Sequence, residues 1–207
     1  MFRAVELYTF LEYCNDSPLE KEVLECGAGT SHALEPLLVR FHEQGYVTHG
    51  IEISEERLRA AQEFCERRQM DLDLRQGDMQ QLPFENESLS FVFSYNSIFH
   101  MSKQGIATAM REIERVLKPG GLCFVNFLSV DSDSFGKGKE ISKGEFLESA
   151  HGGEAIHTYY EDDEPDEYFG SFEMLRKDKR IRTLWFDGEK HARAYIDYIA
   201  EKKRPNM

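Results

Sequence analysis

The sequence predicts an α/β protein built around a parallel β-sheet. Between residues 22 and 128, short apolar segments alternate with longer amphipathic ones, which is the pattern of repeated strand–helix units. The short segments are rich in Val, Ile, Leu and Phe, as expected of strands that are covered on both faces. With 207 residues, the chain is long enough for one well-filled core but not for two, so we expect a single domain with small appendages.

The first part of the chain contains one N-terminal helix and five strands by these criteria. Apolar residues recur at helical spacing near the N-terminus, and we interpret residues 1–20 as a helical cap. The apolar positions of this cap are Phe2, Val5, Tyr8 and Leu11. The predicted strands are Glu22–Cys26, Tyr46–Ile51, Leu72–Arg75, Leu89–Tyr95 and Leu122–Leu128.

Three further helices are predicted between these strands. The first has a single apolar stripe, which consists of Leu34, Leu37, Leu38 and Phe41. The second begins after Ser54, a residue suited to cap a helix, and has two glutamates in its first turn. The third spans Ser102–Leu117, and the following Lys118-Pro119-Gly120-Gly121 ends it abruptly.

Beyond Leu128 the apolar periodicity weakens. Residues 130–153 are rich in Ser, Asp, Gly and Lys, so we predict a mobile loop or lid there. A short helix is predicted over Pro165–Glu173, followed by strands over Lys179–Phe186 and His191–Glu201, although the last segment is also compatible with a helix. We interpret residues 129–172 as a lid or substrate insert of the same domain.

Composition restricts the class of partner. The formal net charge of −13 would repel a phosphate backbone, and the only basic cluster is Lys202-Lys203-Arg204, so nucleic acid is not expected as a substrate. No apolar stretch approaches the length needed to span a bilayer, and we expect a cytoplasmic protein that does not bind membranes. The four cysteines form no CxxC pair, which favours reduced, mostly buried thiols.

The strongest functional signal is the turn after the first predicted strand, Val23-Leu24-Glu25-Cys26-Gly27-Ala28-Gly29-Thr30-Ser31. Glycines at two alternate positions let the backbone turn tightly and approach a ligand closely. The dinucleotide-binding fingerprint requires a third small residue, but His32 stands at that position, which disfavours a pyrophosphate. Glu25, two residues before the first glycine, gives a pattern that resembles the acidic-x-Gly-x-Gly motif of class I methyltransferases that depend on S-adenosylmethionine (SAM).

Two further acidic residues follow predicted strands. Glu52 ends the second strand at the spacing where a carboxylate can accept hydrogen bonds from the two ribose hydroxyls of an adenosyl group. The segment Gly77-Asp78-Met79-Gln80-Gln81-Leu82-Pro83-Phe84 resembles a segment of small-molecule methyltransferases of the quinone-biosynthesis type. This resemblance implies that Asp78 accepts from the adenine amino group and that the Met79 amide meets the ring.

The resemblance extends from Val23 to Phe127 and implies both a fold and a site. The fold is a Rossmann-like three-layer sandwich with a mostly parallel seven-stranded sheet and an antiparallel last strand. The cofactor is SAM, which leaves as S-adenosylhomocysteine. The expected cofactor-binding residues are Glu25, Gly27, Ala28, Gly29, Glu52, Ile53, Asp78, Met79, Tyr95 and Asn96.

The substrate side is less constrained. Methyl transfer needs a general base only for some acceptors, and the candidates are His100, after the fourth strand, and His157. Aromatic residues gather near the N-terminus and in the late insert, so we expect Tyr8, Tyr159 and Tyr160 to line an acceptor pocket together with the two histidines. The acidic run from Glu161 to Glu167 is typical of a solvated helix start rather than a cation cage, and no metal is expected.

These observations predict an enzyme that transfers the methyl group of SAM to an unidentified small molecule. Two alternatives remain open: a SAM-binding sensor or partner subunit without catalysis, and an NAD-dependent oxidoreductase. His32 and the segment from Asp78 to Phe84 argue against the oxidoreductase. The sequence does not identify the acceptor, the atom that is methylated or the oligomeric state.

Overall fold

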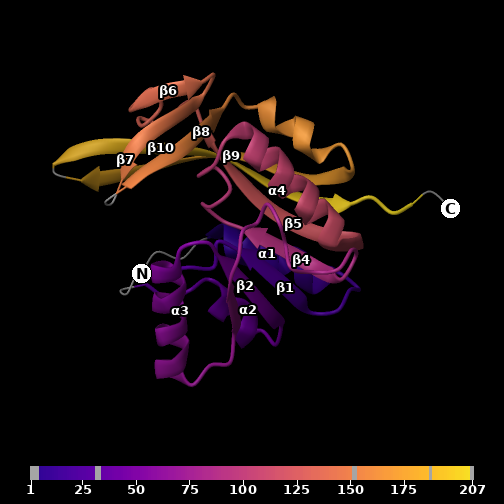
Figure 1. The fold of residues 1–207 in the computed structure, drawn as a ribbon. Helices are drawn as coiled ribbons and strands as arrows, with labels where there is room; N and C mark the ends of the chain where they lie inside the picture. The colour runs from indigo at the N-terminus through magenta and orange to yellow at the C-terminus, as the bar shows by residue number, and fades with distance from the viewer. Residues whose placement is uncertain (1–4, 31–33, 151–152, 187, 206–207) are drawn as a thin grey trace.

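The computed structural model describes residues 5–30, 34–150, 153–186 and 188–205. Seven strands form the main body of the sheet, in the order β3-β2-β1-β4-β5-β10-β9 (Figure 1). Their bounds are β1 Glu22–Cys26, β2 Val47–Glu52, β3 Asp73–Gln76, β4 Leu89–Ser94, β5 Leu117–Ser129, β9 Phe172–Phe186 and β10 Glu189–Lys202. β1 to β5 are parallel, and β10, the last strand of the chain, lies antiparallel between β5 and β9. The predicted mostly parallel sheet with an antiparallel last strand is therefore confirmed.

Both faces of this sheet are covered, because successive residues of each buried strand point to opposite sides. On one face, Leu24 and Val92 pack with apolar residues of α4 (Lys103–Val116). On the other face, Val23 and Phe91 pack with α1 (Val5–Asp16) and α2 (Leu38–Glu43). A fourth helix, α3 (Glu55–Arg68), packs beside β2 and β3. These helices and the sheet make up the three layers that were predicted.

The N-terminal helix forms as expected but buries a different face. Leu7, Phe10, Leu11 and Cys14 are buried against the sheet, whereas the side chains of Val5 and Tyr8 are exposed. Phe2, the remaining position of the predicted stripe, lies outside the described residues. The buried face runs through Leu7, Phe10, Leu11 and Cys14, so of the described positions of the predicted stripe only Leu11 lies on it.

The other helices lie where they were predicted, but some of them are shorter than predicted. Ser54 caps α3, its side chain accepting from the amide of Arg57 at 3.4 Å, and Ser102 caps α4 in the same way. The predicted stripe after the glycines is wrong at Leu34, which is exposed and precedes the six-residue α2. The predicted helix near residue 165 is a 3₁₀ helix, η1 (Glu164–Phe169), that ends before β9 begins.

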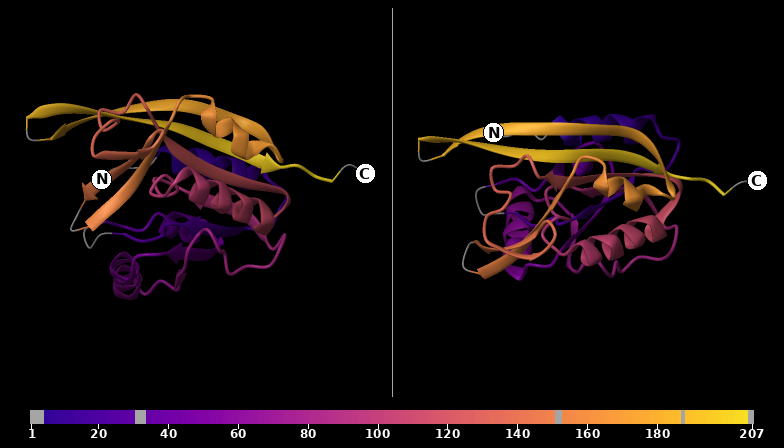
Figure 2. Two further views of the ribbon diagram at one scale, coloured as in Figure 1. Left: turned by 45° about the horizontal axis from the view of Figure 1, so that its top comes forward. Right: turned by 90° about the horizontal axis from the view of Figure 1, so that it is seen from above.

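Residues 130–153 are not the irregular loop that their composition predicted. They contribute β6 (Lys139–Ser142) and β7 (Glu145–Ala150). β6 pairs with β7, and β7 pairs with β8 (Gly153–Tyr160), in an antiparallel extension of the sheet (Figure 1). The segment predicted as the last strand, His191–Glu201, belongs to β10 rather than to a helix. Figure 2 shows the long β9–β10 hairpin projecting beyond the rest of the sheet.

A buried ion-pair network fastens α1 to this hairpin. Arg180 on β9 donates to both carboxylate oxygens of Asp197 on β10, at 2.6 and 3.0 Å, and lies 2.9 Å from Glu6 on α1. All three side chains are at least 85% buried, with exposed fractions of 15%, 8% and 11%. The guanidinium also lies over the rings of Tyr95 and Tyr195. Arg180 thus joins α1, both hairpin strands and the segment after β4.

Removing this guanidinium is expected to destabilise the fold. Arg180→Met would leave the buried carboxylate of Asp197 without its cation and Glu6 with Arg182 alone, 3.9 Å away, which we expect to cost about 3 kcal/mol. The matched control is Arg59→Met, which breaks the exposed pair of Arg59 with Glu55 and should cost less than about 0.5 kcal/mol. Urea unfolding of the variants at neutral pH measures both values. Equal losses would show that Arg180 contributes no more than a surface charge.

Candidate active site at the carboxyl edge of the sheet

The turn after β1 is fixed by its neighbours on both sides. The amides of Gly27 and Ala28 both donate to the carbonyl of Ile51 in β2, each at 2.9 Å. Gly27 has a φ of +84°, which L side chains rarely adopt, and a Cβ there would overlap the Ser97 side chain in the segment after β4. The glycine therefore allows the carboxyl ends of β1, β2 and β4 to meet closely.

Glu52, at the end of β2, closes this turn. One oxygen of its carboxylate accepts from the Gly29 amide at 3.0 Å, and the other accepts from the Ser54 amide at 2.9 Å. The residue is 6% exposed. A Cβ on Gly29 would overlap the Glu52 side chain and the Cβ of Arg57, so the bridge requires a glycine. Each carboxylate oxygen keeps a free lone pair, with which it can accept from a ligand hydroxyl.

Glu25 is the second acid at this edge, and it is almost completely buried in β1. Its Oε2 atom has no hydrogen-bond partner among the described residues. The pKa of its carboxyl is raised to about 8, mainly by burial; the Leu38 amide partly opposes this change and the negative charge of Glu52 adds to it. A buried acceptor without a partner next to two glycines is a place where a donor group of a ligand would be stabilised.

The third acid, Asp78, lies in the turn after β3. Its carboxylate accepts from the backbone amide of Gln80 at 2.8 Å, and the turn is tied to β2 by the bond from the Gly77 amide to the Glu52 carbonyl at 3.1 Å. The Met79 side chain is buried in the core, whereas Ile53, beside Glu52, is 66% exposed. An apolar side chain thus lies open beside two carboxylates at the ends of β2 and β3.

The residues after β4 separate into two groups. Asn96 has a φ of +52°, and Asn126 of β5 holds it by accepting from its amide at 2.7 Å and donating to its side-chain oxygen at 2.8 Å. Tyr95 instead donates to Glu6 of α1 at 3.4 Å and lies beneath Arg180, on the face that α1 covers. Tyr95 and Asn96 were both predicted to bind the cofactor, and of these two only Asn96 is held away from the face that α1 covers.

Sequence reasoning missed Ser97 and Asn126. Ser97 is the side chain that faces Gly27, and nothing in the sequence distinguishes it from other turn serines. Asn126 carried a signal, because a fully buried asparagine interrupts an otherwise apolar strand between Val125 and Phe127.

The two candidate bases lie against each other. The ring centroids of His100 and His157 are 4.7 Å apart with an interplanar angle of 71°, although the residues are distant in sequence. The pKa of His100 is lowered mainly because its ring is partly buried. The neighbouring His157 and the positive charges of Arg57 and Arg193 lower it further. His100 remains exposed to solvent, which limits this effect and leaves the ring accessible. The structure therefore brings both histidines to the segment that follows β4.

The three tyrosines expected to line an acceptor pocket have different surroundings. Tyr8 lies on the outer side of α1 and is 39% exposed. Tyr159 and Tyr160 are fully buried, and the hydroxyl of Tyr160 lies 2.9 Å from that of Tyr168 within the core. Neither buried tyrosine presents its ring to solvent in this conformation.

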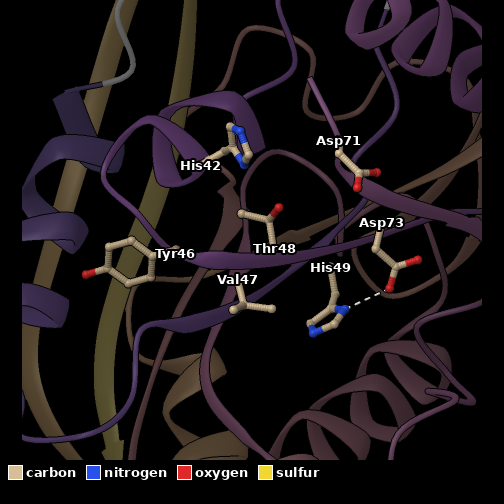
Figure 3. A pocket seen from close by; sticks show the side chains of 7 residues that line it. All are labelled: His42, Tyr46, Val47, Thr48, His49, Asp71 and Asp73. Carbon is tan, nitrogen blue, oxygen red and sulfur yellow. Dashed lines mark hydrogen bonds and ion pairs between the residues drawn. The ribbon is translucent and has the colours of Figure 1, made fainter. Parts of the chain in front are cut away.

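A cavity of about 280 Å³ lies at the opposite edge of the sheet, where β2 and β3 begin (Figure 3). Its lining includes His49, whose Nδ1 lies 2.8 Å from an oxygen of Asp73. Ligands of parallel α/β sheets bind beyond the carboxyl ends of the strands, so this cavity lies at the edge opposite to the candidate site. Within the described part of the chain, no group of three or more His, Cys, Asp or Glu side chains is placed to hold a metal ion.

No described helix is both long and apolar enough to cross a membrane. The four cysteines, all within described segments, are free and buried.

Comparison with known proteins agrees with this geometry. Residues 23–121 match the family model described as a methyltransferase domain, and no curated protein sequence matches the chain. A SAM-dependent methyltransferase of Methanosarcina mazei superposes with a TM-score of 0.74 at 18% identity, covering 94% of this chain and 98% of the other. A second, from Clostridium acetobutylicum, gives 0.71 at 14% identity, with 98% and 93% covered.

A third solved structure is that of a Burkholderia thailandensis methyltransferase, which holds 1,6-didemethyltoxoflavin and S-adenosylhomocysteine. Its TM-score is 0.68 at 13% identity, covering 97% of this chain and 78% of the other. At such low identities these superpositions establish the fold alone.

Proposed function

We propose that this chain, in which residues 23–121 match a methyltransferase domain, is a class I SAM-dependent methyltransferase that methylates a small organic acceptor at the carboxyl ends of β1, β2 and β4. SAM supplies an electrophilic methyl group on a sulfonium. The protein's contribution is to hold the acceptor atom in line with that methyl group and to exclude water from the site.

The observation that carries this proposal is the bridge made by Glu52. Its carboxylate spans the Gly29 and Ser54 amides, and its free lone pairs would accept the two ribose hydroxyls. Exposed Ile53 would lie against the adenine ring, while Asp78 and the Met79 amide would bind its polar edge. Glu25, Gly27 and Ala28 would surround the methionine end, with Asn96 closing that side.

Neutralising Glu52 tests this arrangement. We expect Glu52→Gln to weaken binding of both SAM and S-adenosylhomocysteine about 10- to 100-fold, because charge-assisted bonds to the ribose are lost. Glu55→Gln, which makes the same change in charge on the exposed start of α3, should leave both affinities within about twofold. Isothermal titration calorimetry measures these values. Equal affinities in the two variants would place the ribose elsewhere.

The acceptor side of the proposal rests on charge. With 38 acidic and 25 basic side chains, the protein favours a small acceptor over a nucleic acid, and we propose that it acts in the cytoplasm. Similarity of residues 77–84 to the quinone-biosynthesis type supports an organic ring compound.

Incubation with SAM labelled in its methyl group and an extract of small metabolites tests for turnover. Label should appear in a low-molecular-weight product. Binding of SAM without any transfer would instead favour a sensor, and binding of NAD would favour an oxidoreductase.

A further inference from the structure

The β7–β8 hairpin is built over the end of β4. β4 pairs with β5 as far as Ser94 opposite Val125, and β8 then takes its place beside β5, with Tyr159 opposite Leu128. Thr158 fixes the hairpin to the segment after β4, because its amide donates to the Phe99 carbonyl at 3.0 Å and its hydroxyl to the Met101 carbonyl at 2.6 Å. The hairpin is thereby held next to His100.

This hairpin places a carboxylate behind the two histidines. Nδ1 of His157 lies 3.4 Å from Oε2 of Glu148 on the neighbouring strand, without the alignment of a hydrogen bond, and is buried. The other oxygen of Glu148 accepts from the Tyr159 hydroxyl at 2.9 Å, which fixes the carboxylate. Glu148, the half-buried imidazole of His157 and the exposed imidazole of His100 thus follow one another toward the carboxyl edge of the sheet.

We propose that His100 is the catalytic base that removes a proton from a hydroxyl acceptor, and that Glu148 is a positioning residue that acts through His157. The inference rests on the proposed function and adds the class of acceptor to it. An amine attacks a methyl sulfonium with its free lone pair, whereas a phenol or enol must lose its proton to become a good nucleophile. The second kind of acceptor therefore needs a base, and a base oriented by a further polar group is the usual arrangement that activates a hydroxyl nucleophile.

The reaction then balances as follows. The acceptor O–H bond breaks and its proton moves to an imidazole nitrogen of His100. An electron pair of the oxygen forms the new bond to the methyl carbon, and the pair of the carbon–sulfur bond remains on sulfur. The products are the methyl ether, S-adenosylhomocysteine and the His100 imidazolium.

The surroundings suit this cycle. Charged groups approach the two imidazoles from several elements. Arg57 of α3 and Arg193 of β10 disfavour protonation of His100. At His157, Arg193 again disfavours protonation and Glu148 of β7 favours it. The pKa of His100 is lowered, so the ring is neutral and ready to accept a proton at physiological pH. Glu148 favours the protonated form of His157, the ring that contacts His100.

SAM with a ¹³C-labelled methyl group, incubated with the full-length protein and an extract of small metabolites, tests the acceptor class. The ¹³C chemical shift of the transferred methyl separates O-methyl from N-methyl, S-methyl and C-methyl products, and we expect an O-methyl product. Transfer to nitrogen, sulfur or carbon would overturn this inference while leaving the proposed function intact. No transfer at all would overturn both.

Variants test the residues. With the product so identified, His100→Gln should lower kcat about 100- to 1000-fold with unchanged SAM affinity. Glu148→Gln, which keeps an acceptor for the Tyr159 hydroxyl, should lower kcat about 10-fold and shift the His157 titration seen by NMR to lower pH. The control, His42→Gln at the opposite edge, should stay within about twofold. Unchanged kcat in His100→Gln, or an unshifted His157 titration in Glu148→Gln, would contradict the assigned role.

Discussion

Gly27→Ala is expected to lower the affinity for SAM about 100-fold. A Cβ at this position would overlap the Ser97 side chain, and the φ of +84° is strained for any L residue. Relief of either problem must move the turn away from the ends of β2 and β4, and hence from the carboxylates of Glu25 and Glu52. A 100-fold loss of affinity corresponds to about 3 kcal/mol of binding free energy, which we attribute to backbone strain and to displacement of the turn together.

Gly45 provides a matched control that separates the backbone strain of a positive φ from the overlap with Ser97. It has a φ of +79°, close to that of Gly27, but no atom lies within 4 Å of the position that a Cβ would occupy. Gly45→Ala should therefore cost about 1 kcal/mol of stability in urea unfolding and leave SAM affinity unchanged in calorimetry. Adding Ser97→Gly to Gly27→Ala should restore part of the binding. If the two alanine variants bind SAM equally well, close approach at Gly27 is not required.

The fold could be predicted where local patterns and tertiary packing agree. β1 has the predicted bounds, α3 follows the serine that was expected to cap it, and α4 starts next to Ser102, where the third helix was predicted to begin. Strands buried on both faces are mostly apolar, so their positions are visible in one sequence. The three acids and two glycines could be placed at one edge because parallel strands align their carboxyl ends.

The remainder depends on contacts that no local pattern records. β6 is exposed and mostly polar, and β7 mixes polar and apolar residues without a strong strand signal; both form because β7 pairs with β8, which in turn pairs with the end of β5. The proximity of Glu148 to His157 and His100 follows from the same pairing and could not be deduced from spacing. Asn126 holds Asn96 across two strands, which requires knowledge of which strands are neighbours.

Glu25 is expected to make the stability of the ligand-free protein fall as the pH rises. Its pKa is raised from the ordinary 4.5 to about 8, so between these values the folded protein keeps a proton that the unfolded chain has lost. The stabilising contribution is therefore complete below the unfolded pKa and is lost as the pH rises through the folded pKa. The slope is at most about 1.4 kcal/mol per pH unit, which amounts to several kcal/mol over the interval.

Glu25→Gln removes this titration, so its stability should exceed that of the original protein by about 3 kcal/mol above pH 8 and approach it near pH 5. Urea unfolding across that range measures the difference, and parallel pH profiles would show that Glu25 ionises normally.

The same buried carboxyl links SAM binding to proton release. SAM carries a sulfonium and an ammonium group, and a positive charge near Glu25 favours its ionised form, so binding near neutral pH should expel the proton. The binding heat should then depend on the ionisation enthalpy of the buffer and should lose this dependence in Glu25→Gln. S-adenosylhomocysteine lacks the sulfonium charge and should release fewer protons. Equal buffer dependence for the original protein and the variant would locate the positive end of SAM away from β1.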